Sequence, residues 1–343
     1  MIIIFTIIYG LFIFILTFYF NKTKTLPSYS GDRHQTYVNE KNVPLVGGIF
    51  LLPPLITLFL NYPTFLMFLT IIFFIGLMSD INFLTAPLKR ILLQCFTIFI
   101  FIFFEELKID SSRIYTFDLY LQNIYFSFLF VTFCILILIN GSNFIDGLNG
   151  LLIGYVLIVL FILNHLGLLN GIDIYYENSV IFSFSVLILI LVLNLNNKLM
   201  LGDAGAYCLG FTLAFIIIKL HNQNPNLSPY FFISLIWYPC FENLFSILRK
   251  FSLKISPTKP DNKHLHQLFF LILKKKLKFD NLICNNLSSL SLNTFNFIII
   301  YCASINPSNT KFQIFIIFIS IVSYLFIYTL LKKMINLDKH GTK

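Results

Sequence analysis

The chain has 343 residues, of which 57% are hydrophobic and 11% are charged, and its mean hydropathy is +0.83. Its 24 Lys and Arg outnumber its 15 Asp and Glu, which gives a formal net charge of +9. This balance excludes a soluble globular protein, because too few polar side chains remain to cover its surface. The apolar runs are continuous rather than alternating, so they indicate helices and not barrel strands. We therefore predict an all-α, polytopic transmembrane bundle.

A membrane-spanning helix needs about 20 apolar residues, and the apolar runs divide into about eleven predicted spans. The predicted spans are 2–20, 43–60, 64–79, 88–104, 123–140, 148–165, 178–195, 205–220, 230–248, 286–304 and 312–331. The first run lacks a basic segment before it and a cleavage site after it, so we expect a retained span and not a signal peptide. No internal repeat or separate soluble domain is evident, and we expect one integral membrane domain over 1–343.

The basic residues are unevenly divided between alternate loops. Only Lys108, Arg113, Lys219 and Lys311 fall on one side of the predicted spans, and the other 20 of the 24 Lys and Arg fall on the opposite side. The positive-inside rule makes the richer side cytoplasmic, with the N-terminus outside and the C-terminus inside. The polar interruptions at 21–48, 79–90, 140–150, 196–205 and 249–280 then share the cytoplasmic face. Their convergence predicts a composite site there, in a basic setting suited to anionic lipids and anionic substrates.

The first two polar interruptions each adjoin a predicted span. VPLVGGI, at 43–49, has a proline suited to a helix start and a Gly pair that permits close backbone approach. Ser79 and Asp80 close the third predicted span, and Asp80 is expected where the chain leaves the bilayer. An aspartate in this position is typical of a helix end or cap, and a catalytic role is the alternative.

The segment NGSNFIDGLNGLLIG, at 140–154, directly follows an apolar run. A charged residue facing lipid costs about 2.5–3.5 kcal/mol, so its aspartate is expected to face a bundle interior or a wet cavity. Its glycines indicate either a helix-packing face or a loop that approaches a ligand. The segment LGDAGAY, at 201–207, places Asp203 among small residues at the start of a span. Asp203 is expected to be either a cap of that helix or an oxygen ligand of a divalent cation.

The segment PTKPDNKHLHQ, at 257–267, contains two histidines separated by one residue. This spacing does not suit the i,i+4 zinc pair of a helical HExxH motif, so we expect a loop that presents histidine to a phosphate. Glu242 is a further carboxylate near the membrane, with Arg249 or Lys250 as its expected partner. The six cysteines stand singly, without a CxxC pair, and predict neither disulfides nor zinc. Carboxylates, amides, histidines and basic residues on one face are typical of Mg²⁺-dependent phosphoryl transfer.

The ordered set VPLVGGI, GLMSD, NGSNFIDGLNGLLIG, LGDAGAYCLGF and PDNKHLHQ resembles the polyprenyl-phosphate N-acetylhexosamine-1-phosphate transferases. The resemblance covers about residues 25–270 and is closest to members that serve surface polysaccharide and lipopolysaccharide synthesis. It implies transfer of an N-acetylhexosamine-1-phosphate from a UDP-sugar to undecaprenyl or another polyprenyl phosphate, with release of UMP, in the bacterial inner membrane. It also implies Mg²⁺, with Mn²⁺ as the alternative, no nucleic-acid partner, and contact with membrane lipid. A homodimer remains open.

The resemblance also assigns roles. Asp203 and Asn143 match the metal site, and Asp80 matches the second member of an aspartate pair that guides the lipid phosphate. The implied catalytic residues are Asp80, Asp146, Asp203 and His264. The implied substrate contacts are Ser79, Asn140, Asn143, Asn149, Asn194 and His266.

One position departs from the family pattern, because Ser79 stands where the first aspartate of the pair is usual. A phosphate monoester is largely ionised at neutral pH, so it needs positioning more than deprotonation, and the loss is tolerable on physical grounds. Two alternatives stay open at this point. One is a catalytically impaired homologue, and the other is a transporter in which intramembrane Asp and Asn mark an ion path.

Overall fold

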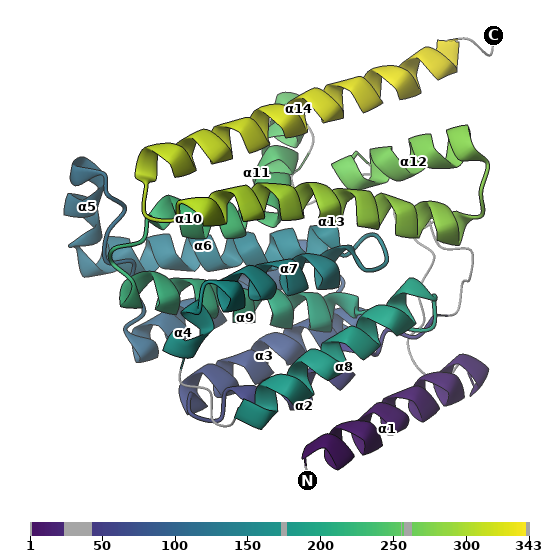
Figure 1. Ribbon diagram of the computed structural model, residues 1–343, viewed down its shortest axis with the longest axis horizontal. Coiled ribbons are helices and arrows are strands. Elements are labelled where there is room, and N and C mark those ends of the chain that lie inside the picture. Colours follow the sequence, from purple (N-terminus) through teal and green to yellow (C-terminus); the bar gives the residue numbers. More distant parts are fainter. Residues whose placement is uncertain (1, 24–42, 173–176, 255, 257–262, 341–343) are drawn as a thin grey trace.

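The structure, a computed structural model, describes residues 2–23, 43–172, 177–254, 256 and 263–340. Within these ranges the chain is helical, and its only extended pairing is an isolated bridge between Leu45 and Met200. The elements are α1 (Ile2–Thr23), α2 (Gly47–Leu58), α3 (Pro63–Asp80), α4 (Pro87–Glu105), α5 (Tyr115–Leu121), α6 (Ile124–Ile145), α7 (Leu151–His165), η2 (Leu168–Gly171), α8 (Glu177–Leu195), α9 (Gly202–Gln223), α10 (Pro229–Leu235), α11 (Trp237–Ser252), α12 (Leu265–Leu277), α13 (Asn281–Ile305) and α14 (Thr310–His340). Most of the long helices run side by side (Figure 1).

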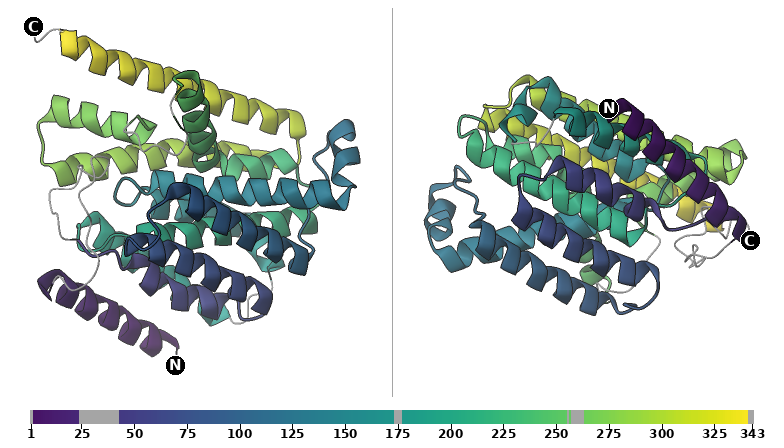
Figure 2. Two further views of the ribbon diagram at one scale, coloured as in Figure 1. Left: turned by 180° about the vertical axis from the view of Figure 1, so that it is seen from behind. Right: turned by 90° about the horizontal axis from the view of Figure 1, so that it is seen from below.

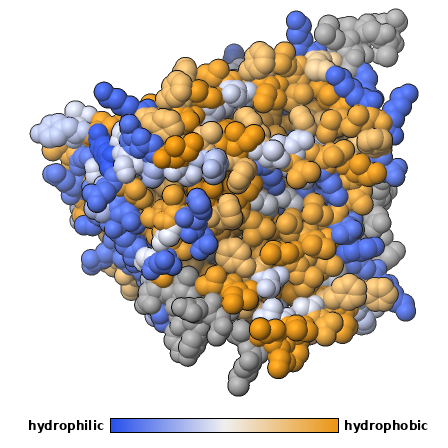
Figure 3. Space-filling model, in the orientation of Figure 1, coloured by the Kyte–Doolittle hydropathy of each residue, from blue (hydrophilic) through white to orange (hydrophobic). Residues whose placement is uncertain are grey.

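Seven helices are long and apolar enough to cross a membrane, namely α1, α3, α4, α6, α9, α13 and α14. The bent pair α10–α11 adds an eighth if it is counted as one span, and α2, α7 and α8 are shorter apolar helices. Each span predicted from the sequence overlaps one of these elements. The predicted all-α, polytopic membrane bundle is confirmed. Figure 3 shows the corresponding surface, in which apolar residues form a broad central area and hydrophilic residues gather at its left and right edges.

Helix α9 is the centre of the bundle, and 94% of its most apolar stretch is buried. It packs against α2, α3 and α6, which surround it (Figures 1 and 2). The close approach depends on small residues, because a Cβ on Gly76 of α3 would overlap the backbone of Ala204. This packing holds the start of α9 against the end of α3, where the polar residues of both helices meet.

Helices α10 and α11 form a sharp bend of 78° at Ile236. Pro239 lies in the first turn of α11 and has no N–H to donate to the preceding turn, which favours a break at this point. After the bend, α11 crosses the bundle steeply (Figure 2, left). Its Asn243 side chain donates to the carbonyl of Ile137 at 3.0 Å and fixes α11 on α6. The bend therefore carries Glu242 toward the polar end of the bundle.

The opposite end of the bundle, beyond the last turn of α9, is fastened by Arg113. Its guanidinium donates to the carbonyls of Pro225, Asn226, Leu227 and Ser308 and to the hydroxyl of Thr310, at 2.8 to 3.0 Å. One side chain thus joins the α4–α5, α9–α10 and α13–α14 connections. Sequence reasoning did not anticipate this contact, and it also missed α5 and α12, which are too short or too basic to stand out as apolar runs.

Candidate active site

The predicted polar segments meet at one end of the bundle. Backbone N–H groups of Gly47 and Gly48 donate to the carbonyls of Met200 and Leu201 at 2.9 and 3.0 Å, which joins the first segment to the fourth. The second segment contacts the fourth through Asp80, and the third contacts the fifth where Gly147 faces His266. Residues 257–262 of the predicted histidine loop lie outside the described residues, and the contacts of the fifth segment are those of residues 263–267.

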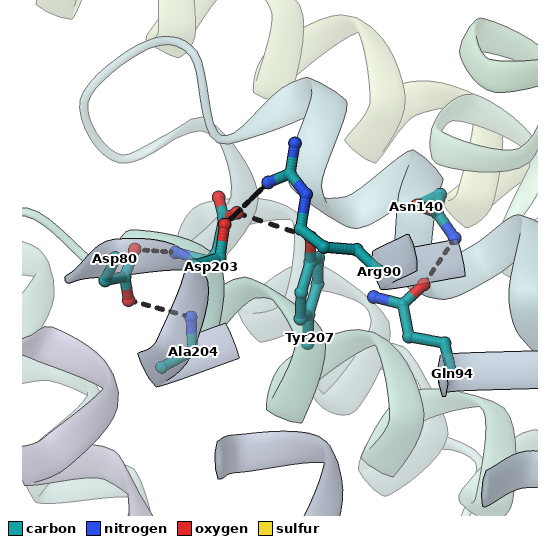
Figure 4. A network of polar contacts seen from close by, with 8 residues as sticks. Asp80, Arg90, Gln94, Asn140, Asp203, Ala204 and Tyr207 are labelled. Atoms are coloured by element: carbon teal, nitrogen blue, oxygen red, sulfur yellow. Dashed lines mark hydrogen bonds and ion pairs between the residues drawn. The ribbon is translucent and has the colours of Figure 1, made fainter. Parts of the chain in front are cut away.

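Asp80 caps helix α9. The Asp203 N–H donates to its Oδ1 at 2.8 Å and the Ala204 N–H donates to its Oδ2 at 3.1 Å (Figure 4). Both carboxylate oxygens therefore satisfy amides that the first turn of a helix leaves without partners. Gly202 makes this possible with a left-handed φ of 75°, because a Cβ there would come within 2.7 Å of Asp80 Oδ2. Asp80 from α3 supplies the cap, which excludes one of the two roles expected for Asp203.

Asp203 instead accepts three hydrogen bonds on one oxygen. Its Oδ2 receives them from Ser79 Oγ at 2.6 Å, from Arg90 at 2.7 Å and from the Tyr207 hydroxyl at 3.3 Å. Figure 4 shows the contacts of Asp203 with Arg90 and Tyr207. The same Arg90 nitrogen donates to Ser79 Oγ at 2.6 Å. The side chains of Arg90 and Asp203 keep 23% and 22% of their surface exposed, so a ligand can reach the ion pair. Ser79 thus stands between the cation and the carboxylate as a bridging hydroxyl.

Asp146 directly follows α6 and is half-buried. Desolvation, followed by the negative charges of Asp203 and Asp80, raises the pKa of the Asp146 carboxyl well above its ordinary value. A cation bound at these helix ends would favour the ionised form of the Asp146 carboxyl. Asn143 is half-buried and lies three residues before Asp146, a spacing that puts both on one side of the helix end.

This donor set fits Mg²⁺. Carboxylate and amide oxygens are the ligands that a hard divalent ion prefers, and Mg²⁺ is typically held by one or two carboxylates together with substrate phosphates. In the described part of the chain, no three His, Cys, Asp or Glu side chains are grouped closely enough to form a complete protein cage. Asp203, with which Asp146 interacts electrostatically, would hold the ion from one side, and the role of Asn143 stays a prediction.

The predicted substrate-binding asparagines divide into two groups. Asn140 faces α4, where its amide donates to Gln94 Oε1 at 3.0 Å, and the buried Gln94 Nε2 has no hydrogen-bond partner among the described residues (Figure 4). Asn149 and Asn194 are buried and hold the 146–150 turn. Asn194 Oδ1 accepts from the Gly150 N–H at 2.6 Å, and Asn149 donates to Asn197. These contacts make Asn194 a support of the turn, and its substrate contact stays a prediction.

The two predicted histidines lie close together. His264 precedes α12 and His266 lies in its first turn, and their rings stack with centroids 5.6 Å apart. His264 Nδ1 is 2.9 Å from Glu242 Oε1, and its ring is 5.2 Å from that of Phe144. His266 is fully buried against Gly147, and burial together with the nearby His264 lowers the pKa of its ring to about 3. The histidine segment is thereby placed against the residues on either side of Asp146.

Sequence reasoning missed several members of this site. Arg90 and Gln94 were not singled out as site residues, although their i,i+4 spacing on α4 puts them on one face. Tyr207 was read only as part of a motif, although it lies four residues after Asp203. The structure gives Glu242 partners other than the expected Arg249 or Lys250, namely His264 and Tyr324. Tyr324 lies on α14, far from every motif, and no local signal pointed to it.

Comparison with known proteins shows which family the chain is similar to. Residues 62–221 match the model of the family described as glycosyl transferase family 4. The chain is 28% identical over 233 residues to undecaprenyl-phosphate alpha-N-acetylglucosaminyl 1-phosphate transferase of Thermotoga maritima. This alignment covers 66% of this chain and 68% of that protein. The proteins of the same name from Escherichia coli K12 and Yersinia pestis are 25% and 26% identical over 152 and 155 residues. These two alignments each cover 42% of this chain and 40% of the relative.

The family match contains Ser79, Asp80, Arg90, the 140–149 segment and Asp203, and it ends before Glu242 and the histidines. The structure joins these later residues to the matched part, since His266 packs on Gly147. By its membrane-spanning helices, the family match over 62–221 and the motif order along the chain, the protein is similar to the superfamily of polyprenyl-phosphate hexosamine-1-phosphate transferases.

Proposed function

We propose that the protein transfers an N-acetylhexosamine-1-phosphate from a UDP-sugar to undecaprenyl phosphate, or to another polyprenyl phosphate, and releases UMP. The product would be the lipid-linked first sugar of a cell-surface polysaccharide or lipopolysaccharide. We place the site on the cytoplasmic face of a bacterial inner membrane, because this end of the bundle adjoins the loops that are rich in Lys and Arg.

The observation that carries this proposal is the accessible Arg90–Asp203 pair at the start of α9, next to Asp146. A guanidinium has a planar fork of donors that suits phosphate oxygens, and an ion pair that is partly exposed can exchange its carboxylate partner for an anionic substrate. Carboxylate and amide oxygens lie at the same helix ends. Phosphoryl transfer to a lipid phosphate requires this combination of a hydrogen-bond donor that binds phosphate oxygens and oxygen ligands that bind a cation.

Each side chain has a role in this scheme. Arg90 binds a phosphate oxygen, and Ser79 orients the guanidinium relative to Asp203. Asp80 acts by holding the first turn of α9, since both of its oxygens accept backbone N–H groups. His264 is held at the edge of the site by Glu242. When bound at Asp203, Mg²⁺ would neutralise charge on the diphosphate.

The reaction asks little of a catalytic base. A phosphate monoester with a second pKa of about 6 is largely ionised at neutral pH, so its oxygen is already nucleophilic. The protein has to align that oxygen with the sugar-bearing phosphorus and to stabilise the charge on the leaving UMP. The absence of the usual first aspartate at Ser79 is compatible with this division of work.

The direct test is a UMP-release assay on purified protein in detergent, with undecaprenyl phosphate, Mg²⁺ and a panel of UDP-N-acetylsugars. We expect release that requires the lipid and is abolished by EDTA, and the best donor identifies the sugar. Release that does not depend on the lipid, or no release from folded protein with any donor, would contradict the proposal.

Asp203→Asn tests the role of the carboxylate within this activity. We expect the loss of at least about 100-fold in turnover, because the substitution removes both the partner of Arg90 and the charged ligand while keeping the side-chain shape. Folding is checked by thermal unfolding in detergent. Turnover within a few fold of the unmodified protein would exclude Asp203 from the reaction.

A further inference from the structure

The last helix of the chain supports the histidine segment. Tyr324 and Tyr328 of α14 are 0% and 4% exposed, and both rings pack edge-on against Phe245 of α11, at centroid distances of 5.4 and 4.9 Å. Their hydroxyls leave this aromatic cluster toward polar groups on α11. These two groups, Glu242 and Arg249, are separated by seven residues, or about two helical turns, so they lie on the same face of the helix.

The first arm of this support runs through Glu242, which is completely buried. The Tyr324 hydroxyl donates to Glu242 Oε2 at 2.7 Å, and His264 Nδ1 lies 2.9 Å from Oε1. An ionised carboxylate can only accept, so the short contact to His264 places a proton on Nδ1. Any contact of this ring with a substrate must then be made by Nε2.

The second arm holds the backbone of the same segment. Arg249 donates one hydrogen bond to the Tyr328 hydroxyl at 3.0 Å and another to the carbonyl of Lys263, the residue immediately before His264. The His264 N–H is in turn within 3.2 Å of Gln267 Oε1, in the first turn of α12. Side chain and backbone of His264 are therefore fixed from two independent points on α14.

We propose that Glu242 and Tyr324 are positioning residues, which hold His264 as the Nδ1-protonated ring and direct its Nε2 toward the substrate. This inference rests on the proposed transferase function for its role in turnover. The family match ends at residue 221, so the support comes from a part of the chain that lies outside that match. Helix α14 is then a component of the site and not only a membrane anchor.

The geometry implies a graded set of effects. Glu242→Gln retains the size of the side chain but replaces its charge and one of its acceptors, and we expect kcat to fall about 10- to 100-fold, the range for a buried hydrogen bond to a charged group. Tyr324→Phe removes one donor and should cost about 3- to 10-fold. In both variants we expect the KM for the UDP-sugar to change by less than the kcat. Tyr301→Phe on the exposed face of α13 is the matched control and should leave turnover unchanged.

A double-mutant cycle separates positioning from general destabilisation. If Glu242 acts through His264, Glu242→Gln should cause no further loss when it is added to His264→Ala. A multiplicative loss in the double variant would overturn the proposal. So would full activity of Glu242→Gln, provided that the unmodified protein releases UMP.

A readout without turnover keeps the inference separate from the proposed function. In protein labelled with ¹⁵N-histidine, two-bond proton–nitrogen spectra report the protonation of each ring nitrogen, and His264 is identified by the signal lost in His264→Gln. We expect a protonated Nδ1 that changes its chemical shift in both Glu242→Gln and Tyr324→Phe. An unprotonated Nδ1 in the unmodified protein would overturn the inference. If protein without transferase activity gave the expected spectrum, the positioning of His264 by Glu242 and Tyr324 would be supported and the proposed function would be contradicted.

Discussion

Ser79 offers the sharpest test of how this site works, because its hydroxyl bridges Arg90 and Asp203. Ser79→Ala removes a donor to Asp203 Oδ2 and an acceptor for Arg90, both at 2.6 Å. A hydrogen bond to a charged group contributes about 1.5–3 kcal/mol, and the partial exposure of both partners favours the lower end of this range. A loss of about 1.4 kcal/mol corresponds to a tenfold change, so we expect kcat/KM to fall about tenfold.

The assay is lipid-dependent UMP release, with Ser291→Ala as the matched control, since that residue is exposed and its hydroxyl donates to the carbonyl of Leu287 in the same helix. Ser79→Asp completes the test by adding a carboxylate next to Asp203. Two such charges about 4 Å apart repel by roughly 4 kcal/mol at an effective dielectric constant of 20, and Arg90 alone cannot balance both. We therefore expect this variant to be less active than the unmodified protein.

Two results would refute this reasoning. Full activity of Ser79→Ala would mean that the bridging hydroxyl has no part in turnover. A large gain of activity in Ser79→Asp would mean that the native site is an impaired form of one that needs two adjacent aspartates.

Three further predictions concern stability. Gly202→Ala should lower the free energy of unfolding by about 1–2 kcal/mol because of the left-handed φ, and by a further amount because the new Cβ clashes with Asp80. Gly167→Ala is the control, since this residue also has a positive φ but lies in open space. In thermal unfolding the control should show only the loss that comes from φ. Because the pKa of His266 is lowered, this histidine is protonated in the unfolded chain but neutral in the folded protein between about pH 6.5 and 3. The free energy of unfolding should therefore fall on acidification, and from pH 7 to pH 5 it should fall by about 2 kcal/mol more in the unmodified protein than in His266→Gln. Equal pH dependence in both proteins would contradict a lowered pKa of His266. Arg113→Ala should lower the melting temperature without changing UMP release, because its acceptors all lie at the opposite end of the bundle; a selective loss of turnover would show that this end takes part in the reaction.

Much of the fold follows from the sequence because a bilayer permits few solutions. Apolar runs in lipid must satisfy their backbone groups internally, and this requirement alone gives the helices. The meeting of the polar segments follows from counting basic residues in alternate loops, since every second connection returns to the same end of the bundle. Polar residues directly beside an apolar run have a high free-energy cost if they face lipid, so they are expected to face a bundle interior or a functional site. This argument singled out Asp203, Asp146 and Asn143.

The rest depends on contacts between distant parts of the chain. Whether Asp80 or Asp203 caps α9 is decided by how α3 and α9 pack, across 123 residues, and either aspartate satisfies the local pattern. Glu242 looked like a partner for a nearby cation until the bend at Ile236 carried it to His264. Tyr324 stands in an apolar helix in which a tyrosine is ordinary, so only its burial against Glu242 distinguishes it.

The capping of α9 by Asp80 affects how sensitivity to mutation at this position should be understood. An aspartate that shapes a site and one that reacts in it are equally intolerant of alanine, because loss of the cap displaces Asp203 as surely as loss of a base stops a reaction. Asparagine separates them, since its amide oxygen still accepts one helix N–H while its charge is gone. If Asp80→Asn is nearly active and Asp80→Ala is inactive, Asp80 has a structural role as the cap. If both variants are inactive, Asp80 takes part in the reaction itself.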